Sequence, residues 1–157
     1  MEDDWGSSWA WGLGLTALTI VIHAVGIVLM ARWLEHVRAV VLGRQRSKLR
    51  DSLTATVVVG AVGWLLAVLH GLEAGLWAVV LLWLGAIDTP HRAILFSLDS
   101  MATRGASGLH LAAEWQLMGS LEASAGMLAY GVSTAFVFAI LLRIMPLLGL
   151  RGFTQQE

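Results

Sequence analysis

The sequence contains no cysteine and few charged residues. Without cysteine, disulfide bonds and thiol chemistry are excluded. Charged residues make up 13% of the chain and hydrophobic residues 57%, whereas soluble domains are about 25% charged. This composition indicates an integral membrane protein embedded in a lipid bilayer. The formal net charge of −1 carries no information about nucleic acid, and no such partner is predicted.

Three apolar runs are long enough to cross a bilayer, whose core of about 30 Å needs about 20 helical residues. The second run, 52–87, is about 36 residues long, which is too long for one simple crossing. It is either one long helix, tilted or projecting from the membrane, or a hairpin of two short spans broken near His70 and Gly71. The break lacks the residues that form turns, so a single long helix is favoured.

Basic residues concentrate between the first two runs, where six of the ten Lys and Arg residues lie from Arg32 to Arg50. The positive-inside rule places this loop in the cytoplasm, the N-terminus outside and the C-terminus in the cytoplasm. The N-terminal Met1-Glu2-Asp3-Asp4 is acidic where a signal peptide needs positive charge. The first span is therefore interpreted as an uncleaved anchor.

The segment between the second and third runs has the layout of a pore loop. Asp88 or Thr89 suits the N-cap, and Pro90 the first turn, of a short helix that reaches about Thr103. Residues 104–108 are then expected to be extended before the chain returns to the surface. Non-helical backbone at membrane depth is tolerated only where protein buries it or where it lines a water-filled cavity. This layout predicts a re-entrant helix and loop around the central pathway of an oligomer.

With these elements in this order, the chain resembles the pore-loop potassium channel family. The resemblance lies in a short helix with Phe96-Ser97, a filter-like loop and a last helix with mid-helix glycines. The stretches 71–78 (GLEAGLWA) and 126–135 (GMLAYGVSTA) are similar to small bacterial members that add one helix before the two-helix pore unit. The resemblance covers about residues 55 to 142. It implies a homotetramer with permeant ions in a bacterial inner membrane, and a gating hinge at Gly126 or Gly131.

The filter positions depart from the family pattern, which reads Thr-Val-Gly-Tyr-Gly-Asp. Only its first and third residues are kept. Potassium selectivity in the family rests on the carbonyl groups of four such loops, and its second glycine takes a backbone conformation that serine resists. A potassium filter of family geometry is therefore not expected. The matching positions, predicted to shape the pathway, are Thr103, Arg104, Gly105, Ala106, Ser107 and Gly108.

Arg104 has three interpretations. It pairs with Asp99, five residues earlier, and this charge-assisted contact supports a loop of different shape; Glu122 is another candidate partner. Alternatively, four Arg104 side chains face the lumen about 8 Å apart, repel by about 2 kcal/mol per pair and favour anions. In the third, the loop is exposed at the outer mouth.

Ionisable residues inside membrane spans are rare and usually face the bundle interior. His70 and Glu73 share one helical face and are predicted to form a polar cluster at the outer mouth. The alternative is a proton relay or metal site with Glu122. His23 is predicted to be a lone interhelical hydrogen bonder. Because two candidate ligands without cysteine are a weak metal signal, neither a metal site nor a cofactor is predicted.

The sequence thus predicts an all-α integral membrane protein with three transmembrane helices, one re-entrant pore helix and a pore loop per subunit, in a potassium-channel-like tetramer. Its predicted function is passive ion conduction, not catalysis, because no nucleophile–base pair is evident. The alternatives are a non-conducting structural or regulatory subunit and a proton-coupled carrier that uses His70, Glu73 and Glu122. The predicted segments are an acidic tail (1–8), a first transmembrane helix (9–31), a basic cytoplasmic linker (32–51), a long outer helix (52–87), the pore helix and filter loop (88–116), an inner helix (117–143) and a C-terminal tail (144–157).

Overall fold

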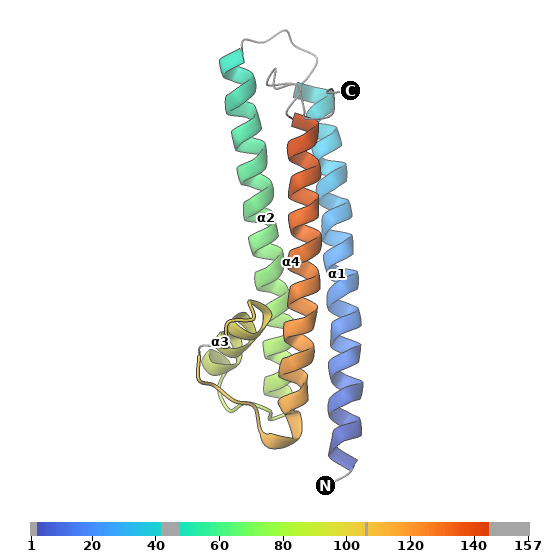
Figure 1. Cartoon of the computed structure of the whole chain (residues 1–157), viewed down its shortest axis with the longest axis vertical. Helices are drawn as coiled ribbons and strands as arrows, with labels where there is room; N and C mark the ends of the chain where they lie inside the picture. Colours follow the sequence, from blue (N-terminus) through green and yellow to red (C-terminus); the bar gives the residue numbers. More distant parts are fainter. Residues whose placement is uncertain (1–2, 42–47, 106, 145–157) are drawn as a thin grey trace, which may run out of the picture.

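The fold comes from a computed structural model, which describes residues 3–41, 48–105 and 107–144, with side chains described within 6–36, 52–105 and 107–144. Over these residues all regular structure is helical. The three long helices run side by side, and the short α3 packs against α2 and α4 near the end that holds the N-terminus (Figure 1). The elements are α1 (Asp3–Val41), α2 (Lys48–Trp83), α3 (Pro90–Met101), the 3-10 helix η1 (Ala113–Trp115) and α4 (Gln116–Ile144).

The long helices carry the surface expected of membrane spans. Large apolar side chains point outward, including Val57 at 69%, Trp64 at 67% and Trp83 at 72% exposure. So extensive an apolar surface suits lipid rather than water. The prediction of an all-α chain with three spans is confirmed in length and composition. The helical stretches that can cross a membrane are Gly6–His36, Ser52–Trp83 and Ala113–Ile144.

Two predictions about helix boundaries hold. α2 is continuous through residues 70–71, so the hairpin is excluded. α3 begins where the sequence places it, with Thr89 as its N-cap and Pro90 in its first turn. The Thr89 hydroxyl accepts the Arg92 N–H at 3.4 Å, while Asp88 pairs with the Arg92 guanidinium at 2.7 and 2.8 Å. α3 then ends before residue 103, the predicted limit.

α2 ends four residues before the predicted boundary at 87, because a glycine closes it. Gly85 has a φ of 68°, the left-handed conformation. Its N–H donates to Leu82 O at 3.1 Å, and the N–H of Ala86 donates to Leu81 O at 2.9 Å. This pair of bonds is the Schellman arrangement that ends a helix. The turn frees residues 84–89 to redirect the chain into α3.

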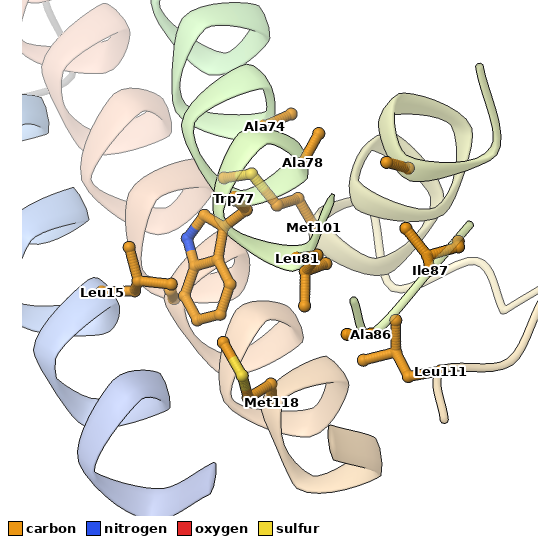
Figure 2. Close-up of a cluster of buried hydrophobic side chains, with 12 residues drawn as sticks. Leu15, Ala74, Trp77, Ala78, Leu81, Ala86, Ile87, Met101, Leu111 and Met118 are labelled. Atoms are coloured by element: carbon orange, nitrogen blue, oxygen red, sulfur yellow. The ribbon is translucent and has the colours of Figure 1, made fainter. Parts of the chain in front are cut away.

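α3 is fixed to the bundle by close packing. Trp77 of α2 is fully buried, near Leu15 of α1 and Met118 of α4 (Figure 2). Met101, at the end of α3, is 2% exposed, and its backbone lies against the backbone of α4 at Gly126. A Cβ atom at Gly126 would lie only 2.7 Å from Met101 Cα. The absence of a side chain at Gly126 therefore lets the two backbones meet.

Candidate functional site

A buried carboxylate anchors the loop after α3. Asp99 is 6% exposed. Its Oδ2 accepts the Ser107 N–H at 2.9 Å, its Oδ1 lies 3.1 Å from Arg104 Nε, and its carbonyl accepts the Arg104 N–H at 3.0 Å. The predicted Arg104–Asp99 pair is therefore present, and Arg104 does not pair with Glu122. These contacts hold Arg104 and Ser107 close to the end of α3.

Left-handed residues interrupt the loop, which corrects the expectation that residues 104–108 are extended. Thr103 has a φ of 54°, Gly105 of 58° and Gly108 of 65°. Left-handed backbone is routine for glycine and uncommon for threonine. Ser107 is not among these left-handed residues. Ala106 lies outside the described residues.

The loop starts deep along α4 and is exposed. Met101 contacts Gly126, ten residues after Gln116, the first residue of α4. At about 1.5 Å per residue, this contact lies about 15 Å along the helix. Thr103 and Gly105 are exposed, and the Arg104 side chain is 68% exposed despite its pairing with Asp99. In a single chain, these non-helical residues are therefore exposed at this depth.

A second polar region lies inside the three-helix bundle. His23 comes from α1, His70 and Glu73 from α2, and Ser133 from α4. His23 Nδ1 is 2.9 Å from Glu73 Oε1, and His70 Nδ1 is 3.4 Å from Glu73 Oε2. The Ser133 hydroxyl lies 3.1 Å from Nε2 of His70 and 3.1 Å from Nε2 of His23. We call these four residues the central cluster, a closed ring of polar contacts.

The central cluster corrects two predictions. It lies in the bundle interior rather than at the outer mouth, since Glu73 is 1% exposed and Ser133 comes seventeen residues after Gln116, the start of α4. Its third ionisable member is His23 and not Glu122. His23 does bond between helices, but it is not a lone residue.

Polar and aromatic neighbours surround the central cluster. One helical turn away, the Trp77 indole N–H donates to the Thr19 hydroxyl at 2.9 Å. The Tyr130 ring stacks on His70, with centroids 4.1 Å apart and planes 18° apart. An open groove of about 470 Å³ reaches the cluster from the bundle surface. Its lining includes Gly63, Leu66, His70, Tyr130, Ser133 and Phe138.

Glu122 is fully buried elsewhere, beneath α3. It lies near the hydroxyls of Ser97 and Ser100. Ser100 donates its own hydroxyl to Gly119 O at 2.9 Å, which ties α3 to α4. Glu122 thus lies against the second half of α3, and its role as a filter-support residue stays a prediction.

The two glycines predicted as hinges differ in their surroundings. Gly126 contacts the backbone of Met101, whereas a Cβ at Gly131 would meet no atom within 4 Å. α4 is an uninterrupted helix through both positions. Close packing therefore accounts for Gly126, and the hinge stays a prediction.

Sequence reasoning did not connect His23 or Ser133 to the central cluster. A mid-span histidine and an i,i+3 His–Glu pair were visible signals, but Ser133 gave none. No protein-family model, curated protein or solved structure matches the chain. Function must therefore be inferred from the geometry of two regions. One is the loop after α3 that Asp99 holds in place through Arg104 and Ser107, which we call the anchored loop. The other is the central cluster.

Proposed function

We propose that the protein is a subunit of an oligomeric, potassium-channel-like membrane protein in which α3 and residues 102–112 line a passive ion pathway. The observation that supports this most is the depth of the loop. It starts about 15 Å along α4, and its non-helical residues Thr103, Arg104 and Gly105 are exposed. Lipid does not satisfy such groups, whereas a neighbouring subunit or a water-filled pathway does.

The family that the chain resembles supplies the rest of this proposal. It implies four subunits around a central axis, in a bacterial inner membrane. The basic loop between α1 and α2 then faces the cytoplasm with the C-terminus, and the acidic N-terminus lies outside.

The anchored loop also suggests how charge acts on the pathway. Each Arg104 is exposed but lies 3.1 Å from a buried Asp99 oxygen. The pair has no net charge, so a ring of four such pairs does not exclude cations as four isolated arginines would. We infer that removing either partner, rather than the pair, changes the charge preference of the pathway.

Ion flux from purified protein in liposomes tests the proposal, under separate potassium, sodium, proton and chloride gradients. Wild-type protein is expected to pass cations. Asp99→Asn leaves an unpaired guanidinium and shifts the preference towards chloride, whereas Arg104→Val shifts it towards cations. Arg92→Ala is the matched control, because it breaks an Arg–Asp pair at the other end of α3, whose partners are 44% and 65% exposed.

Two results would overturn the proposal. A monomer in detergent and in membranes would leave the loop without a neighbour and remove its main support. Intact oligomers that pass none of the four ions would instead favour the non-conducting structural or regulatory subunit of the same fold.

A proton-coupled carrier is the second candidate, and the closed ring of the central cluster favours it. With Glu73 ionised, His23 can donate Nδ1–H to its carboxylate at 2.9 Å, and His70 Nδ1 faces the other carboxylate oxygen at 3.4 Å. Ser133 can then accept from one Nε2 and donate to the other, a route for a proton between His23 and His70. A proton flux abolished by Glu73→Gln, but unchanged in Asp99→Asn, would favour the carrier over the loop pathway.

A further inference from the structure

We propose that His23, His70 and Glu73 form a binding site for a divalent transition-metal ion of the zinc class. The three residues offer two imidazole nitrogens and a carboxylate, the donor set that zinc and similar ions take in proteins. One ligand atom from each residue can be chosen so that all lie within 4.8 Å of one another. The site lies away from the anchored loop, so a test of metal binding does not depend on whether the loop lines an ion pathway.

The distances between the donor atoms fit a single ion. Bonds of about 2.0–2.1 Å to nitrogen and oxygen separate two ligand atoms by about 2.9 Å at right angles and by about 3.4 Å at the tetrahedral angle. His23 Nδ1 lies 2.9 Å from Glu73 Oε1. His70 Nδ1 lies 3.4 Å from Glu73 Oε2. Each of these two distances is one that a pair of ligands on the same ion would have, and one donor atom from each residue lies within 4.8 Å of the others.

Two atoms of this set lack hydrogen-bond partners among the described residues. They are His70 Nδ1 and Glu73 Oε2, and both are buried. Buried polar groups are nearly always satisfied, and each exception calls for an explanation. A cation between the carboxylate and the two Nδ1 atoms satisfies both at once.

Ser133 is placed to orient both imidazoles. Metal-ligating histidines almost always donate their second ring N–H to an acceptor, which fixes the tautomer and the ring plane. Here the acceptor is one hydroxyl oxygen, 3.1 Å from Nε2 of His70 and 3.1 Å from Nε2 of His23. Its two lone pairs accept both N–H groups, so both Nδ1 atoms are left free to bind the ion.

The ion has a route to the site. The groove of about 470 Å³ is lined by His70 and Ser133, and His70 is 9% exposed while Glu73 is 1% exposed. Tyr130 stacks over the His70 ring at this opening. His70 therefore lies at the opening of the groove, and Glu73 and His23 lie further inside.

Cobalt and zinc titrations of the full chain in detergent micelles test this site, after removal of any histidine tag. Co²⁺ alone is the spectroscopic probe, because imidazole and carboxylate ligands give it visible absorption bands. We expect one Co²⁺ per chain, displaced by Zn²⁺, and a raised unfolding temperature with either ion. Glu73→Gln, His23→Gln and His70→Gln should each abolish stoichiometric binding. Ser133→Ala keeps all three ligands and should weaken binding about 10- to 100-fold.

Two matched controls separate the site from general effects. His91→Gln and His110→Gln remove exposed histidines and should leave cobalt binding unchanged. A loss of binding is interpreted only where helix content and oligomer size match those of the wild type. If a ligand variant does not fold, the weakened cobalt binding of Ser133→Ala tests the site instead. Failure of folded wild-type protein to bind either ion would overturn the proposal. So would binding that persists in Glu73→Gln, or binding that is lost in the controls.

Discussion

The central cluster and the anchored loop both pair polar groups within the helical bundle, but their contacts span very different distances along the sequence. In the cluster, three contacts join residues 50, 63 and 110 positions apart in the sequence. Each of them needs two packed helices, and the closed ring needs all three. In the loop, Asp99 binds Ser107, only eight positions away. The difference teaches that distant side chains hold the helices to one another, whereas local contacts set the shape of one turn.

The largest effect is expected from breaking the cluster with Glu73→Ala. Two buried imidazoles lose their acceptor and a cavity is left, so the free energy of unfolding should fall by about 3 kcal/mol. Equilibrium unfolding in detergent micelles measures it. Glu114→Ala, an exposed acid on η1, should change stability by less than about 0.5 kcal/mol. An equal loss of unfolding free energy in the two variants would mean that the central cluster does not stabilise the bundle.

The second largest effect is expected at the contact between Met101, at the end of α3, and Gly126 of α4. Gly126→Ala places a Cβ 2.7 Å from Met101 Cα, and backbone cannot move aside as a flexible side chain does. We expect a loss of about 2 kcal/mol and faster proteolysis of residues 102–108. Gly131→Ala is the control on the same helix, with no atom within 4 Å. It should gain up to about 1 kcal/mol, so a loss in Gly131→Ala would contradict this account.

A smaller effect is expected from Asp99→Asn, which breaks the anchor of the loop. The Arg104 side chain is 68% exposed, so solvent screens that pair, and most of the loss comes from the weaker bond to the Ser107 N–H. We expect about 1 kcal/mol and faster hydrogen exchange at the Ser107 amide. The amides around Glu73 should exchange as in the wild type. Faster exchange there would show that the two regions are coupled.

The smallest effect belongs to Arg92→Ala at the start of α3. Both partners of the Asp88–Arg92 pair are well exposed, at 65% and 44%, and exposed i,i+4 pairs contribute about 0.3–0.5 kcal/mol. Unfolding should change by that amount in low salt and by less at about 1 M salt, where charges are screened over about 3 Å. A loss above about 1 kcal/mol that persists in high salt would contradict a surface role.

Local features were within reach of the sequence. The three apolar runs, the start of α3 at Thr89-Pro90, the unbroken second helix and the Arg104–Asp99 pair all depend on residues close together in the chain. The end of α2 was a local feature too, since Gly85 supplies the left-handed residue that closes a helix. Its position was missed because the apolar run continues to Ile87.

What only the tertiary structure decided is which residues face one another across the bundle. The three long helices are apolar on every side, so periodicity does not tell which face of a helix turns inward. Ser133, one hydroxyl in an apolar helix, therefore gave no sign that it meets two histidines, and Gly126 gave no sign that it touches Met101. The sequence alone determined the spans and the local turns. The rotation and relative depth of the helices, which set contacts between distant residues, decided the central cluster.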